Sequence, residues 1–115
     1  MIFTLIVTSD HLNNNFHALE TAKAILTQQE QINCIYFLFN GAYTANKYID
    51  MPSDEYAITQ QWQNFAQEYN LPMLVCKASA LRRGIEATNM ATGFRFGSIG
   101  ELVAACDLAD RVIRL

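Results

Sequence analysis

Runs of apolar residues alternate with segments of helical periodicity along most of this chain. Residues 2–8 and 32–39 are almost continuously apolar, which predicts two strands buried on both faces, as in a parallel sheet. Between them, the apolar side chains of residues 16–29 recur every three or four positions, as an amphipathic helix requires. The first third of the chain therefore predicts a strand, a helix and a second strand.

The middle of the chain repeats this alternation. A loop extends from residue 40 to Pro52, and Ser53 and Asp54 are good N-caps for a second helix. Four apolar side chains of that helix form one stripe: Ile58, Trp62, Phe65 and Tyr69. The run 71–76 then predicts a third strand, followed by a short basic helical turn over residues 77–84.

The last third predicts two more strands and a helix. Residues 84–92 are irregular, and residues 94–96 alternate as a short strand does. Ser98 and Glu101 form a capping box that opens the last helix, and residues 111–115 are a closing strand. This order predicts one domain over residues 1–115, a three-layer α/β fold with a mainly parallel, five-stranded sheet and right-handed crossovers.

Parallel strands bring their carboxyl ends to one edge of the sheet, where open α/β folds bind their ligands. Thr8, Asn40 and Cys76 are expected at this edge. Tyr43 and Asn46 follow the second strand, and they either line a site around Cys76 or shape the loop.

Composition narrows the class of protein. The chain has 115 residues, of which 51% are hydrophobic, enough for a core that needs no disulfide or metal to hold it together. A net charge of −3 argues against direct binding to nucleic acid, which requires clustered positive charge. No signal peptide is visible, and no run reaches the about 18 apolar residues of a membrane span. A cytoplasmic protein is expected.

The three cysteines are expected to be reduced thiols. A disulfide pair would leave one cysteine over, and none of the three has a metal-ligand spacing. Cys34, inside an apolar strand, and Cys106, on the last helix, are both expected to be buried. His11 and His17 have no metal spacing and are expected at the surface. Since residues 8–15 contain no glycine, a flavin or nucleotide site is disfavoured, and neither cofactor nor metal is expected.

Cys76 is the candidate reactive residue. It ends a strand and begins a helical turn, where unpaired backbone N–H groups favour a thiolate. Lys77, Arg82 and Arg83 follow within seven residues and are candidates for stabilising the thiolate or contacting a partner. The alternatives are a cysteine that acts as a small buried hydrophobe, and arginines on a solvated face or a subunit contact.

Several segments in this order resemble the DsrE/TusD family, over nearly the whole chain. They are residues 41–46, 53–55, 62, 76 with 80–84, 93–94 and 110–113, of which 76–84 is the most specific. The resemblance implies a DsrE-like fold and a sulfurtransferase whose cysteine, here Cys76, carries sulfane sulfur as a persulfide. The chain departs from the family in a glycine-free loop at 9–15 and a short stretch at 84–93. The second departure lies close in sequence to Cys76 and bears on the identity of the partners more than on the chemistry.

The resemblance also implies partners. TusD-like chains form a hexamer with TusB-like and TusC-like subunits, and relay sulfur from a TusA-like donor to a TusE-like or DsrC-like acceptor for 2-thiolation of tRNA wobble uridine. DsrE-like chains form similar hexamers in sulfur oxidation, and a homo-oligomeric relative is a further alternative. A structural subunit with an inert cysteine is the alternative from another class.

Overall fold

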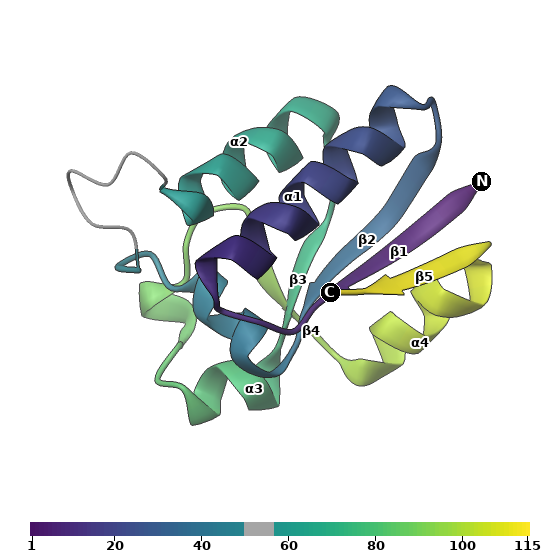
Figure 1. Cartoon of the computed structure of the whole chain (residues 1–115). Helices are drawn as coiled ribbons and strands as arrows, with labels where there is room; N and C mark the ends of the chain where they lie inside the picture. Colours follow the sequence, from purple (N-terminus) through teal and green to yellow (C-terminus); the bar gives the residue numbers. More distant parts are fainter. Residues whose placement is uncertain (50–56) are drawn as a thin grey trace.

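A five-stranded, all-parallel sheet forms the centre of the protein. The computed structural model describes residues 1–49 and 57–115. The strands lie in the order β4-β3-β2-β1-β5 (Figure 1). Their bounds are β1 Ile2–Val7, β2 Gln31–Phe37, β3 Met73–Cys76, β4 Phe94–Gly97 and β5 Arg111–Arg114. The prediction of an α/β fold with a five-stranded parallel sheet is confirmed.

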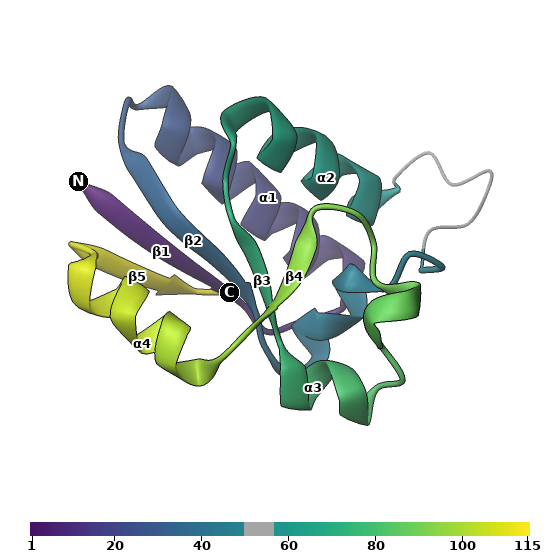
Figure 2. The ribbon, with the colours of Figure 1, turned by 180° about the vertical axis from the view of Figure 1, so that it is seen from behind.

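Helices cover both faces of this sheet. The α-helices are α1 Leu12–Thr27, α2 Ile58–Tyr69, α3 Lys77–Arg82 and α4 Ile99–Leu108, and the 3₁₀ helices are η1 Phe39–Ala45 and η2 Ala87–Asn89. α1 and α2 pack on one face, and α4 lies on the other (Figure 2). The connection through α4 returns across the sheet and brings β5 beside β1. In the described parts of the chain, no helix is long and apolar enough to cross a membrane.

The main core lies between the sheet and the helices α1 and α2. Trp62 is fully buried, and its ring meets that of Phe37 edge-on with 5.4 Å between centroids. Phe65 continues the buried stripe of α2, whereas Tyr69, at the end of the helix, is half exposed. Trp62 is thus a core residue of this chain.

A smaller cluster lies between the sheet and α4. Cys34, Tyr36, Leu74, Cys76 and Leu102 are its buried members. α4 buries one side chain, Leu102, and so leaves Cys106 only half-buried. Cys34 is buried as predicted, but the prediction that Cys106 is buried too is wrong.

The element boundaries differ from the prediction mainly at α1 and η1. α1 begins at Leu12, four positions before the predicted start, although its first turn is rich in asparagine, a weak helix former. One of these asparagines, Asn15, is buried and hydrogen-bonded, which compensates for low propensity. The predicted loop after β2 forms η1, and the predicted N-caps Ser53 and Asp54 lie outside the described residues.

The capping box of the last helix forms as predicted. Ser98 Oγ accepts a hydrogen bond from the Glu101 amide at 3.0 Å, and the Ser98 amide donates to Glu101 Oε1 at 3.2 Å. These two bonds fix the start of α4 directly after Gly97, the last residue of β4. Gly97 is the register partner of Cys76, so the capping box lies next to the cysteine.

Candidate functional site around Cys76

Cys76 lies at the carboxyl edge of the sheet, where β3 ends and α3 begins. It is the N-cap of α3, and its Sγ accepts a hydrogen bond from the Ser79 amide at 3.5 Å. Only 6% of the residue is exposed. Thr8 follows β1 and Asn40 lies in η1, so both are at the carboxyl ends of neighbouring strands, as predicted. Cys76 is therefore a shielded thiol at the edge where α/β folds bind ligands.

Hydrogen-bond donors surround the sulfur of Cys76. Burial raises the pKa of the Cys76 thiol, but hydrogen bonds from the Ser79 hydroxyl and amide, the Tyr36 hydroxyl and the Ala78 amide lower it. The hydrogen bonds outweigh burial, so the pKa of Cys76 lies below its ordinary value. This arrangement favours the thiolate, which is the nucleophilic form of cysteine.

Tyr36 approaches Cys76 from the neighbouring strand β2. The side chain is fully buried, and its hydroxyl donates to the Gly97 carbonyl at 2.9 Å. Burial, together with the nearby sulfur of Cys76, raises the pKa of Tyr36 above its ordinary value. The phenol therefore keeps its proton when Cys76 loses one, and can act as a donor to the thiolate.

Ser79 joins the site to η1. Its buried Oγ accepts a hydrogen bond from the Phe39 amide at 3.0 Å, which leaves its own proton for Cys76. Phe39 has a φ of 54°, a left-handed conformation that is unusual for a bulky side chain. This backbone conformation accompanies the approach of the Phe39 amide to Ser79.

Two of the three predicted cations are exposed side chains at the two ends of α3, and neither is among the groups that shift the pKa of Cys76. The Lys77 ammonium lies over the ring of Phe96, 5.9 Å from the centroid, and Arg82 is exposed at the end of α3. The groups that lower the pKa of Cys76 are hydrogen-bond donors rather than these cations.

Arg83, the third predicted cation, connects α3 to η1. Its Nε and Nη2 donate to Asn40 Oδ1 at 3.0 and 2.8 Å, and its Nη1 donates to the Ser79 carbonyl at 3.0 Å. The guanidinium also lies over the ring of Tyr43, 5.8 Å from the centroid. Arg83 therefore holds the backbone around the cysteine in place.

The remaining sequence candidates have structural positions. Asn46 forms a bridge with Met90, and its side chain accepts a hydrogen bond from the Tyr48 amide, so it shapes the loop. His11 and His17 are exposed, as predicted. Across residues 1–49 and 57–115, no three His, Cys, Asp or Glu side chains gather as a metal site would require.

Sequence reasoning missed Tyr36 and Ser79. Ser79 could have been found, because it stands three residues after Cys76 in the first turn of the helix that Cys76 caps. Tyr36 reaches Cys76 only because β2 pairs with β3 in the register that places Tyr36 opposite Leu74. No local pattern in the sequence contains that information.

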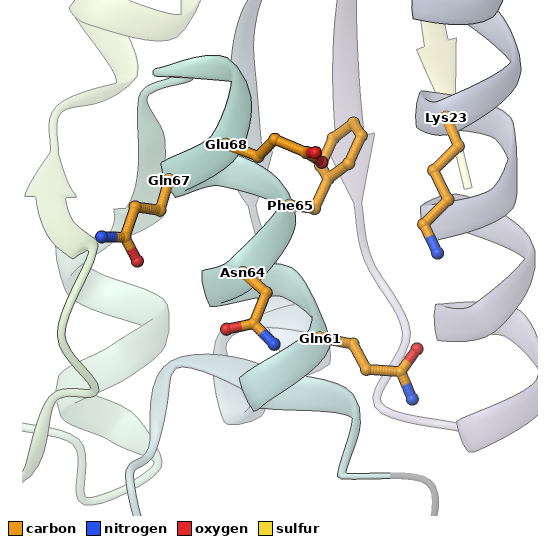
Figure 3. Close-up of a pocket in the computed structure, with 6 residues that line it drawn as sticks. All are labelled: Lys23, Gln61, Asn64, Phe65, Gln67 and Glu68. Carbon is orange, nitrogen blue, oxygen red and sulfur yellow. The ribbon is translucent and has the colours of Figure 1, made fainter.

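A surface groove of about 510 Å³ lies elsewhere, between α1 and α2 (Figure 3). Lys23 of α1 faces the polar side chains of α2 across it, among them Gln61, Asn64 and Glu68. The groove is on the face of the sheet opposite to α4, whereas Cys76 packs in the cluster on the α4 face. It does not belong to the cysteine site.

The sequence is similar to a known protein family and to named sulfurtransferases. The DsrE/DsrF-like family matches residues 1–115. The chain is 31% identical to the sulfurtransferase TusD of Cronobacter sakazakii, over 98% of each chain. It is 34% identical to the DsrE protein of Allochromatium vinosum, over 84% of this chain and 82% of that protein.

The fold has a counterpart among solved structures. The crystal structure of the YchN protein from E. coli superimposes with a TM-score of 0.84 and covers all of both chains, at 22% sequence identity. At this identity the superposition shows a shared fold. The family match and the TusD relative show similarity in sequence over nearly the whole chain. The chain belongs to the DsrE/DsrF-like family, and its relatives include sulfurtransferases named TusD.

Proposed function

We propose that this protein is a sulfurtransferase of a sulfur relay, and that Cys76 carries the sulfur as a persulfide. The observation that carries the proposal is the position of Cys76 as the N-cap of α3, where the Ser79 amide donates to its sulfur and hydrogen bonds lower its pKa. Cys34 contrasts with it, because burial raises the pKa of that thiol to about 11. Family membership supports the same chemistry, since relatives are named sulfurtransferases.

The proposed reaction has two exchange steps. In loading, the Cys76 thiolate attacks the outer sulfur of a donor persulfide, the sulfur–sulfur bond of the donor breaks, and the donor leaves as a thiolate. In delivery, an acceptor thiolate attacks the outer sulfur on Cys76, and Cys76 leaves as a thiolate. Each step moves one neutral sulfur atom, so no external oxidant or reductant is required.

The pathway that we favour is a TusD-like one in the cytoplasm. The chain would work in a hexamer with TusB-like and TusC-like subunits, between a TusA-like donor and a TusE-like acceptor, for 2-thiolation of tRNA wobble uridine. The TusD relatives at 31–34% identity support this choice. A DsrE-type relay with a DsrC-like acceptor is the second candidate, because the Allochromatium vinosum relative is equally similar.

The predicted cations receive separate roles in this proposal. Lys77, next to Cys76 in the chain, and Arg82, at the end of α3, are exposed and would contact an acidic surface on a partner that delivers or receives sulfur. Arg83 would act indirectly, because its hydrogen bonds to Asn40 and Ser79 hold η1 against α3.

The test is the intact mass after incubation with a persulfide donor. Wild type should gain the mass of one sulfur atom, and Cys76→Ser should gain none. Cys106→Ser is the matched control, because it makes the same chemical change at a half-buried cysteine outside the site, and it should load like wild type.

Sulfur on Cys76→Ser would overturn the assignment of the carrier residue. Absence of loading in wild type, with the partner subunits present, would favour a structural subunit with an inert cysteine. Partner capture from the source cell then separates the two pathways, since TusB-like and TusC-like subunits support tRNA thiolation and sulfite-reductase components support sulfur oxidation.

A further inference from the structure

The hydroxyl of Tyr36 has two acceptors within reach and one proton to give. It donates to the Gly97 carbonyl at 2.9 Å, and the sulfur of Cys76, in the same buried cluster, is a second acceptor for the same proton. The two acceptors are adjacent because Cys76 and Gly97 are register partners in the β3–β4 pair. A hydrogen bond to a charged acceptor is stronger than one to a neutral acceptor. The proton should therefore turn to Cys76 when its sulfur is charged, and to Gly97 when it is neutral.

Ser79 is arranged to give its proton in one direction. Its Oγ accepts the Phe39 amide at 3.0 Å, and its own amide donates to Cys76 Sγ at 3.5 Å. With one lone pair of the hydroxyl occupied by Phe39, the hydroxyl proton is left for the sulfur. Cys76 thus has two buried hydroxyls as neighbours, Tyr36 of β2 in the same cluster and Ser79 in the helix that Cys76 caps, and each can donate to its sulfur when that sulfur is charged.

We propose that the hydroxyls of Tyr36 and Ser79 are catalytic groups that stabilise Cys76 as the departing thiolate, and so promote delivery of the sulfur rather than its uptake. This inference rests on the proposed relay function. In the loaded state Sγ is bonded to the outer sulfur and carries no full charge. When an acceptor thiolate attacks the outer sulfur, the bond between the two sulfurs breaks and its electron pair ends on Sγ.

The two steps respond to the donors in opposite ways. A more acidic leaving thiol departs faster, which favours delivery. The same acidity makes the Cys76 thiolate a weaker nucleophile, which slows loading once the thiol is fully ionised. At neutral pH this loss is offset, because the donors also increase the fraction of Cys76 that is ionised.

The experiment uses Tyr36→Phe and Ser79→Ala, with Tyr69→Phe as the matched control on a half-exposed tyrosine of α2. Alkylation of Cys76 by iodoacetamide, followed by peptide mass spectrometry, should shift to higher pH in the two variants and stay unchanged in the control. Loss of one hydrogen bond to the charged sulfur should reduce the ionised fraction at neutral pH about tenfold.

The decisive measurement compares the rates per ionised Cys76 near neutral pH, with the ionised fraction of each variant taken from its alkylation curve. Loading from inorganic polysulfide should become about threefold faster, and delivery to glutathione about threefold slower, as a tenfold change in acidity predicts. A packing fault would instead change both rates in the same direction. Equal rates in the variants and wild type, or two rates that fall together, would overturn the proposal.

Two further measurements keep the tests separate. Alkylation needs no sulfur transfer, so an unshifted alkylation curve refutes the hydroxyl role, while absent loading in wild type refutes the relay function. If Tyr36→Phe does not fold, a ring-fluorinated tyrosine at position 36 keeps the hydroxyl and makes it a stronger donor. Its alkylation curve should then move to lower pH, and no movement would count against the proposal.

Discussion

Asn15 should contribute strongly to the stability of the protein, although it is a polar residue in the first turn of a helix. Its side chain is buried, and Oδ1 accepts a hydrogen bond from Trp62 Nε1 at 2.6 Å. Nδ2 donates to Thr44 Oγ1 at 2.8 Å and to the Ser9 carbonyl at 3.1 Å. One amide thereby connects α1 with α2 and with η1, the element that borders the cysteine site.

The change Asn15→Ala removes all three hydrogen bonds and leaves two buried partners without them, Trp62 Nε1 and Thr44 Oγ1. A buried group that loses its partner costs about 1–3 kcal/mol. Because Trp62 is fully buried and Thr44 nearly so, water cannot easily replace the amide. The expected loss in the free energy of unfolding is about 3–4 kcal/mol, a large part of the roughly 5–15 kcal/mol that domains possess.

Urea denaturation is the assay, and Trp62 is a convenient probe because it is the single tryptophan of the chain. Asn13→Ala is the matched control, since it makes the same chemical change at an exposed position of the same helical turn. The control should change the free energy of unfolding by less than about 0.5 kcal/mol. If Asn15→Ala is no less stable than Asn13→Ala, the reasoning about this network is wrong.

Two other changes test the core and the close approach of η1. Cys34→Ser should lower the free energy of unfolding at neutral pH by about 1–3 kcal/mol, because it buries a hydroxyl. Since burial raises the pKa of Cys34 from 9.0 to about 11, the unfolded chain ionises first and wild type should lose about 2–3 kcal/mol between these pH values. Cys34→Ser should lack this loss of stability. Urea titrations at several pH values measure it, and an equal fall in the free energy of unfolding for wild type and variant would contradict the assignment to Cys34. Gly41→Ala should lower the free energy of unfolding by about 3 kcal/mol or more, because its Cβ would overlap the Val7 carbonyl. Gly84→Ala should lower it by only about 1 kcal/mol, because its Cβ meets open space and the cost comes from the φ of 75° alone. Comparable melting temperatures for the two glycine variants would refute the steric argument.

The sequence predicts the layers of this fold because buried strands and amphipathic helices differ in hydrophobic period. Residues 2–8 and 32–39 correspond closely to β1 and β2, and the apolar stripe beginning at Ile58 corresponds to α2. The start of α1 could not be predicted in this way, because the residues around Asn15 are polar. Their helical conformation depends on tertiary hydrogen bonds, which periodicity does not report.

The site was predictable in position and less so in its chemistry. Cys76 is recognisable from the change of a strand into a helical turn, and it occupies that junction in the fold. Proximity in sequence suggested that cations would lower its pKa, yet Lys77 lies over an aromatic ring and Arg83 binds Asn40. Tyr36, whose hydroxyl does lower the pKa of Cys76, is 40 residues away in the chain and adjacent only through strand pairing.

The pairing of β5 with β1 has a consequence for biosynthesis. Phe3 pairs with Arg111, and the Asp110 amide donates to the Ile2 carbonyl, so contacts between distant parts of the chain complete the sheet. Such contacts form slowly because a long loop must close first. A nascent chain that has formed α4 but not β5 therefore exposes one edge of β1, which is open to pairing with other chains until β5 pairs with it.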